Sequence, residues 1–122
     1  MLLTSRTFMI SPSGHKFAEL NVEGWKDHTP GTPKAILALV DYVRRLDRSG
    51  PLVVHCSAGI GRSAVFLAAM QMTILHEKKL PIDIPLIARE LRLQREGMLS
   101  NPSQYDILYE CKTVLHDSTC CN

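Results

Sequence analysis

Hydrophobic and polar positions in this 122-residue chain fall into two short strand-like runs followed by four stretches with helical spacing. Residues 6–10 have strand-like content, and residues 16–22 alternate polar and apolar side chains. The turn signal Ser-Pro-Ser-Gly at residues 11–14 stands between these runs. The pattern therefore predicts a β-hairpin, which is marginal in water without further strands beside it.

The first helical stretch follows Thr32, a candidate N-cap, with Pro33 at the first helical position. We expect this helix to end near Gly50. Its apolar positions recur at helical spacing and predict a core-facing stripe: Ile36, Leu39, Val40, Val43 and Leu46. The arginines between them indicate a solvated face.

Three further helices are predicted in the second half of the chain. One runs from about residue 62 to 79 and is apolar on most sides, as a buried central helix would be. Another starts at Asp83 and ends at Gly97, and the last starts at Asn101. The candidate core residues of the middle helix are Ile84, Ile87, Ala88, Leu91 and Leu93.

The stretch His-Cys-Ser-Ala-Gly-Ile-Gly-Arg-Ser at residues 55–63 lies between an apolar run and the central helix. The run at residues 52–54 predicts a buried strand, and the two glycines allow a tight loop with closely approaching backbone. Because a helix begins near Arg62, loop N–H groups and the positive helix end converge. This arrangement favours binding of an anion.

A cysteine in such a loop is expected to ionise below the ordinary thiol value, which makes Cys56 a candidate nucleophile. The planar guanidinium of Arg62 matches two phosphoryl oxygens, and Ser63 can donate a hydrogen bond toward the sulfur. The alternative is a buried structural cysteine beside a glycine turn.

Composition narrows the class of protein. The chain is 45% hydrophobic and 21% charged, as in ordinary globular domains, and 14 basic against 12 acidic residues indicate no nucleic-acid partner. No apolar run is long enough to predict a membrane span. Four cysteines at no disulfide or zinc spacing indicate a reducing, cytoplasmic environment with no metal or cofactor.

The residues 55–63 resemble the signature loop of the phosphotyrosine-specific protein tyrosine phosphatases, and the similarity extends from about residue 6 to 116. It matches only the C-terminal portion of that family's domain. The resemblance implies an α/β fold with a strand, phosphate loop and helix at its core, several helices and a short hairpin. It implies no cofactor, a supporting role for His55, and phosphate binding by the loop residues Ser57, Ala58, Gly59, Ile60, Gly61 and Arg62.

Residues 25–28 resemble the family's mobile W-P-D-H loop, in which the aspartate protonates the leaving phenolate. This resemblance makes Asp27 the general acid and Trp25 a supporting residue. Lys26 stands in place of proline, so ordering of the loop is expected to cost more. Taken alone, the segment is a surface turn anchored by its tryptophan.

The segment from Arg89 to Glu110 resembles the family stretch that carries two glutamines. Ser100 occupies the place of the glutamine that positions the hydrolytic water, whereas the second glutamine is kept as Gln104, which the resemblance makes the candidate to position that water. The alternative for Gln104 is an ordinary helix-surface residue. The substitution at position 100 is expected to slow the second chemical step more than the first.

The sequence thus predicts a partial tyrosine phosphatase domain at residues 1–117 and a tail at 118–122. Its expected activity is hydrolysis of phosphotyrosine in proteins through a cysteinyl-phosphate intermediate. Two alternatives stay open: a pseudophosphatase or phosphotyrosine-binding module with little turnover, and an incomplete domain that does not fold alone. Dual-specificity phosphatases and arsenate reductases share the C-x-x-x-x-x-R spacing but fit the flanking segments less well. The oligomeric state is not predicted.

Overall fold

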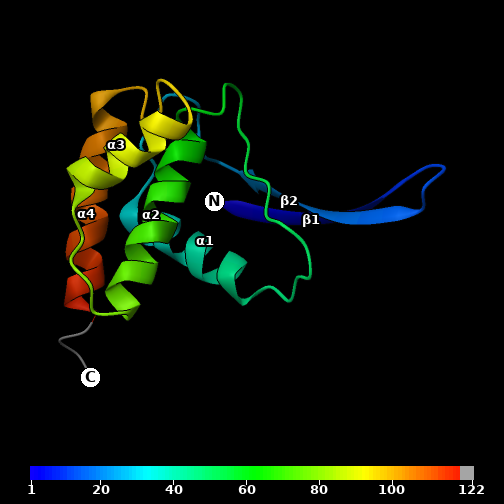
Figure 1. Cartoon of the computed structure of the whole chain (residues 1–122), viewed down its shortest axis with the longest axis horizontal. Coiled ribbons are helices and arrows are strands. Elements are labelled where there is room, and N and C mark those ends of the chain that lie inside the picture. Colours follow the sequence, from blue (N-terminus) through cyan, green and yellow to red (C-terminus); the bar gives the residue numbers. More distant parts are fainter. Residues whose placement is uncertain (119–122) are drawn as a thin grey trace.

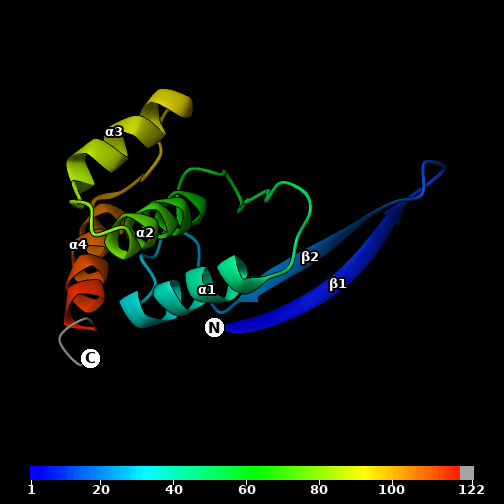
Figure 2. The same cartoon turned by 60° about the horizontal axis from the view of Figure 1, so that its bottom comes forward.

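A computed structural model describes residues 1–118 and consists of a long β-hairpin beside a body of four helices (Figure 1). The strands β1 (Leu2–Ile10) and β2 (His15–Glu23) are antiparallel, with Phe8 opposite Phe17. The predicted hairpin is confirmed, and both strands are longer than the sequence pattern indicated. The hairpin projects away from the helices at its turn, as the turned view shows (Figure 2).

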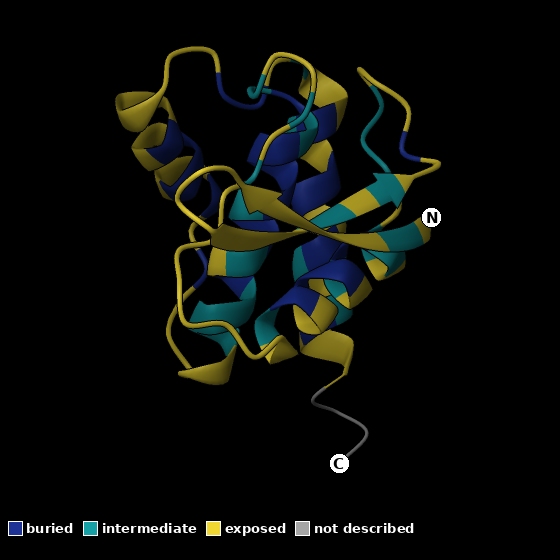
Figure 3. Cartoon of the chain, turned by 90° about the vertical axis from the view of Figure 1, so that its right-hand side faces the viewer, coloured by how far each residue is buried: buried dark blue, intermediate teal, exposed yellow. Residues whose placement is uncertain are grey.

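Only the base of the hairpin packs on the body. Leu3, Leu20 and Val22 lie against the core, because residues that alternate along a strand share one face. Toward the turn both faces are exposed to solvent (Figure 3), and the stacked rings of Phe8 and Phe17 lie there with centroids 5.3 Å apart. The hairpin therefore has an uncovered apolar end.

The four predicted helices are present as α1 (Pro33–Arg45), α2 (Arg62–Glu77), α3 (Ile84–Gln94) and α4 (Pro102–Asp117). The side chain of Asp83 caps α3 by accepting the Leu86 N–H at 3.0 Å, and Asn101 caps α4 by accepting the Gln104 N–H at 3.1 Å. Thr32 precedes α1 without a side-chain cap bond. The starts were thus predicted well from capping residues and prolines.

The ends of two helices were predicted too late. Helix α1 stops at Arg45, five residues before Gly50, and Leu46 is already extended. Helix α3 stops at Gln94, because Arg95 leaves the helix with extended backbone and its guanidinium bonds to the loop around Cys56. A glycine favours the end of a helix, but the residues just before it need not be helical.

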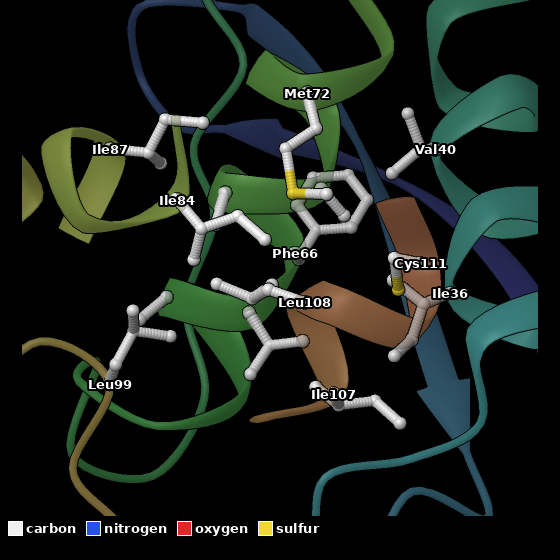
Figure 4. Packing of buried hydrophobic residues seen from close by; sticks show 14 of the residues in the cluster. Ile36, Val40, Phe66, Met72, Ile84, Ile87, Leu99, Ile107, Leu108 and Cys111 are labelled. Atoms are coloured by element: carbon white, nitrogen blue, oxygen red, sulfur yellow. The ribbon is translucent and has the colours of Figure 1, made fainter. Parts of the chain in front are cut away.

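The core gathers apolar side chains from all four helices around α2, where Phe66 and Met72 lie between Val40 of α1 and Leu108 of α4 (Figure 4). Most predicted core positions are buried. Leu46 and Leu93 are not: they are 39% and 69% exposed. Leu46 lies beyond the end of α1, and Leu93 lies on the outer face of the last turn of α3, so neither position reaches the core.

The expected strand at residues 52–54 is absent, and this prediction is wrong. Residues 51–56 form no regular secondary structure, and the sheet in residues 1–118 contains only β1 and β2. Leu52 is 37% and Val53 is 80% exposed, whereas Val54 packs against the core. An apolar run specifies extended backbone but becomes a buried strand only where neighbouring strands cover it.

Hairpin, helices and phosphate-loop segment together give an α/β arrangement, as the resemblance implied. Within residues 1–118 none of the helices is both long enough and apolar enough to span a bilayer. The end of the predicted tail, residues 119–122, lies outside the described residues.

Candidate active site

The loop at residues 55–63 turns the chain sharply between the extended segment and α2. Gly59 has φ +77°, a left-handed conformation that favours glycine, and its N–H donates to the sulfur of Cys56 at 3.3 Å. Cys56 itself is half-buried at the start of the loop, while His55 and Ser57 are exposed. The backbone therefore points an N–H group at the candidate nucleophile.

Helix α2 begins directly after this turn. Gly61 is its N-cap and supplies no capping side chain, and the first helical bond runs from the Val65 N–H to the Gly61 carbonyl at 3.1 Å. The N–H groups of the first turn consequently have no side-chain acceptor from the cap position. They add to the positive end of the helix at the loop.

These donors set the acidity of the Cys56 thiol. Burial on its own raises the pKa of Cys56, but the hydroxyl and N–H of Ser63 and the N–H groups of Gly59 and Gly61 outweigh it. The pKa falls from 9.0 to about 7, which makes a large fraction of the thiol ionised near neutral pH. The Ser63 hydroxyl is buried, and its contact with the sulfur lowers the pKa of the thiol.

The segment between α3 and α4 holds the loop from behind. Arg95 donates from Nη2 to the Ala58 carbonyl at 2.9 Å, and the Leu99 N–H donates to the Ile60 carbonyl at 2.8 Å. Sequence reasoning missed both contacts. Arg95 belongs to the stretch that resembles the family, and this resemblance could have indicated that it contacts the loop. The bond from the Leu99 N–H is made by the backbone, so no residue type in the sequence indicates it.

Gln104 lies buried beneath the loop rather than on the helix surface, so the alternative of a surface glutamine is wrong. Its Oε1 accepts from the Ser100 hydroxyl at 2.9 Å, and its Nε2 lies against Gly61, where a Cβ would stand only 2.8 Å away. The two residues at the family's glutamine positions thus bond to each other and support the turn into α2.

The segment carrying Asp27 reaches Arg62 from the other side. Arg62 donates from Nη1 to the Trp25 carbonyl at 3.0 Å, and its Nη2 lies 3.4 Å from Asp27 Oδ1. Asp27 is largely accessible, with 44% of its side chain exposed. The structure therefore brings the predicted acid and the predicted phosphate-binding cation together, although 35 positions separate them in the sequence.

Trp25 is buried, at 8% exposed, while Lys26, Asp27 and His28 are exposed, which agrees with a surface turn anchored by its tryptophan. Its Nε1 donates to the Thr29 carbonyl at 3.1 Å, which closes the segment into a compact loop. The ring packs at Gly31, where φ is +76° and a Cβ would lie 3.1 Å from the indole. The tryptophan anchors the acid-bearing loop on the body.

Two buried donors around the phosphate loop have no hydrogen-bond partner within residues 1–118, Arg62 Nε and Gln104 Nε2, and the Ser63 hydroxyl, also buried, acts only on the Cys56 sulfur. Buried polar groups without partners cost free energy, so donors of this kind beside one loop indicate a place where a ligand could accept their hydrogen bonds. Residues 1–118 contain no cluster of histidine, cysteine and carboxylate side chains that could hold a metal ion. Positive charge at this place comes from Arg62 and from Arg95, whose guanidinium lies against Gly59.

Comparison with solved structures gives the class of fold. A Trypanosoma cruzi protein tyrosine phosphatase superposes with a TM-score of 0.78 at 30% sequence identity, covering 92% of this chain and 40% of that one. A Trypanosoma brucei protein tyrosine phosphatase gives 0.79 at 26% identity, covering 90% and 41%. The hairpin and helices thus follow the protein tyrosine phosphatase fold.

Sequence comparison agrees. The family model for protein-tyrosine phosphatases matches residues 3–113, and the chain belongs to this family. Tyrosine-protein phosphatase non-receptor type 13 of Homo sapiens is 40% identical over 94 residues, which cover 76% of this chain and 4% of that protein. The type 20 enzyme of Rattus norvegicus is 38% identical over 97 residues, covering 79% and 23%. The chain therefore spans less than a quarter of these relatives' length.

Proposed function

We propose that this chain hydrolyses phosphotyrosine in proteins through a cysteinyl-phosphate intermediate. The observation that carries the proposal is the Cys56 thiol, with a pKa of about 7, at the mouth of a loop whose donor Arg62 Nε has no partner in the described chain. A phosphoryl group supplies the oxygen acceptor that such a donor lacks. Membership of the protein-tyrosine phosphatase family supports phosphotyrosine in proteins as the substrate class.

In the first step the Cys56 thiolate attacks phosphorus, forming an S–P bond as the P–O bond to the tyrosyl oxygen breaks. Arg62 and the N–H groups of residues 57–61 hold the phosphoryl oxygens, where charge develops in the transition state. Asp27 gives its proton to the leaving phenolate. General acid catalysis of this kind contributes typically about 10²–10⁴-fold in rate.

In the second step water attacks the phosphocysteine, the S–P bond breaks and inorganic phosphate leaves. Asp27, now a carboxylate, takes the proton from the water. Gln104 is the proposed supporting group, because it lies beneath the loop against Gly61. His55 and Trp25 support the loop and the acid-bearing segment without reacting themselves.

A second candidate is a phosphotyrosine-binding module with little turnover. The observation that favours it is the bond from the Ser100 hydroxyl to Gln104 Oε1 at 2.9 Å, which directs the shorter side chain toward its neighbour and not toward a water on phosphorus. Cys56 and Arg62 are both present, so binding and the first step remain chemically possible while hydrolysis slows.

The test is pre-steady-state turnover of p-nitrophenyl phosphate by the purified chain, followed by a phosphotyrosine peptide. Sustained release of phosphate that disappears in Cys56→Ser, and that falls about 10²-fold or more on the phosphotyrosine peptide in Asp27→Ala, supports the phosphatase. A burst of one p-nitrophenolate per protein followed by almost no turnover supports the binding module. No burst from a chain with a cooperative thermal transition refutes both catalytic steps.

We further propose that residues 1–117 form one partial phosphatase domain and that the protein acts in the cytoplasm, where a free Cys56 thiolate persists. Limited proteolysis tests the domain: one protected fragment ending near residue 117 is expected. Cleavage within α1–α4 at the earliest time point would contradict it.

A further inference from the structure

Asn101 joins two parts of the site that lie far apart in the sequence. Its side-chain Nδ2 donates to the His28 carbonyl at 3.1 Å, across a separation of 73 residues. Its Oδ1 accepts the Gln104 N–H at 3.1 Å and the Ser103 hydroxyl at 2.6 Å. One side chain therefore caps α4 and also holds the loop that carries Asp27.

The loop needs such a restraint. His28 has φ +60°, a left-handed conformation that L-residues other than glycine rarely adopt and that costs free energy. Strained backbone of this kind persists where its surroundings fix it. The His28 N–H donates to Asp27 Oδ1 at 3.0 Å. Asn101 binds the carbonyl of His28, and the N–H of the same residue orients the carboxylate of Asp27.

The other end of the loop is closed independently of Asn101. Thr29 donates from Oγ1 to the Lys26 carbonyl at 2.6 Å, and Arg62 donates to the Trp25 carbonyl at 3.0 Å. These bonds set the turn and its start. Within the described residues, the bond from Asn101 is the hydrogen bond that ties His28 to the opposite wall of the site.

We propose that Asn101 is a positioning residue for the general acid: by binding the His28 carbonyl, its side-chain amide holds Asp27 opposite Arg62. The inference rests on the proposed function. Asn101 touches no reacting atom, and its effect on the rate passes through Asp27. Nothing in its role as a helix cap requires this second bond, because serine caps helices as well as asparagine does.

Because serine and asparagine cap helices equally well, Asn101→Ser separates the two functions of the side chain. Asn101→Ser keeps an N-cap oxygen for α4 but is too short to reach the His28 carbonyl, whereas Asn101→Ala removes both functions. Ser103→Ala is the matched control, because it removes a hydrogen bond at the same helix start and leaves the His28 bond in place. Thermal unfolding of all three variants reports the cost to the fold separately.

The readout is the ratio of kcat/KM for phenyl phosphate and p-nitrophenyl phosphate. Phenolate needs protonation to leave, and p-nitrophenolate needs it much less, so a misplaced acid lowers the first rate more. We expect Asn101→Ser to lower phenyl phosphate turnover by about 2- to 10-fold, the worth of one hydrogen bond, with a smaller loss for p-nitrophenyl phosphate. Ser103→Ala leaves the ratio unchanged.

The same variant in the Asp27→Asn background tests whether Asn101 acts through the acid. No further loss is expected, since no proton remains to be positioned. Equal losses on both substrates, or a second loss of the same size in the Asp27→Asn background, would overturn the proposal.

Failure of the proposed function is recognised separately, because Trp25 is the only tryptophan and sits in the same loop. If the unsubstituted chain has no turnover, the phosphatase proposal and the role in catalysis both fail. Acrylamide quenching of Trp25 fluorescence then tests whether the bond from Asn101 to His28 holds the loop, independently of catalysis. A larger quenching constant in Asn101→Ser than in Ser103→Ala supports this role, and equal constants refute it.

Discussion

Gly61 and the side-chain amide of Gln104 are packed so closely that a Cβ at position 61 would lie 2.8 Å from Gln104 Nε2. The space at position 61 thus favours a residue without a side chain. The turn into α2 therefore depends on a side chain from α4.

Gly61→Ala is expected to destabilise the chain by about 1–3 kcal/mol through overpacking and to distort the phosphate loop. Urea unfolding measures the cost. Gly50→Ala is the control, because a Cβ there meets nothing within 4 Å. In a Gln104→Ala background most of the Gly61→Ala cost should disappear; an unchanged cost would show that the Gln104 contact is not its cause.

The pH dependence of Cys56 alkylation follows from its lowered pKa. The reactive thiolate forms as pH rises, so the rate with iodoacetamide should increase through a midpoint near pH 7 instead of 9.0. Cys111 is the internal control, since burial raises its pKa to about 12 and it should not react. Peptide mapping by mass spectrometry separates the sites.

Ser63→Ala should move the Cys56 midpoint upward, because the Ser63 hydroxyl lowers the pKa of the thiol. The same alkylation profile measures the shift. A midpoint that stays near 7 in this variant would assign the acidity to the backbone N–H groups alone.

Arg44 and Glu77 join α1 to α2 through two hydrogen bonds of 2.6 Å each. Both side chains are partly exposed, so a double-mutant cycle with alanine should give a coupling of about 0.5–1 kcal/mol that weakens in salt. Arg45→Ala is the comparison, because its partner Asp41 lies on the same helix and the pair is more exposed. A coupling free energy of zero would show that this ion pair does not stabilise the contact between α1 and α2.

The coupling of Arg44 and Glu77 should also depend on pH. The hydrogen bond from Arg44 lowers the pKa of Glu77 below its ordinary value of 4.5. The stabilisation is thus complete above 4.5 and is lost as pH falls through the lowered folded-state pKa. Repeating the cycle at about pH 3 and at pH 7 checks the sign.

The exposed end of the hairpin should promote association of the purified chain, since uncovered apolar strands pair with other molecules. Phe8→Thr with Phe17→Thr removes the stacked rings, which are 39% and 44% exposed. We expect less light scattering at high concentration and a thermal transition lowered by only a few degrees. Leu108→Thr, in the core, should abolish the transition instead.

Local signals predicted the helices well. Pro33, Asp83 and Asn101 each mark a helix start that the structure has, because proline and capping side chains act within one turn. Residues 52–54 were misjudged since a buried strand needs neighbours, and no local pattern states whether neighbours are present.

The candidate site was predicted in its parts but not in its connections. Cys56, Arg62 and Asp27 were named from motif chemistry, and the structure places the last two 3.4 Å apart. The bonds from Arg95 to Ala58 and from Asn101 to His28 were missed, because an arginine or a capping asparagine has many possible partners. Tertiary packing selects one of them.

These connections also determine when the site forms during folding. Arg62 and Trp25, like Arg95 and Ala58, are separated by 37 residues, and Asn101 and His28 by 73. Each bond closes a long segment of chain, and this closure loses conformational entropy before any contact compensates for it. Helices α1–α4 can form from local contacts, so binding competence should appear last on refolding, after helical structure is complete.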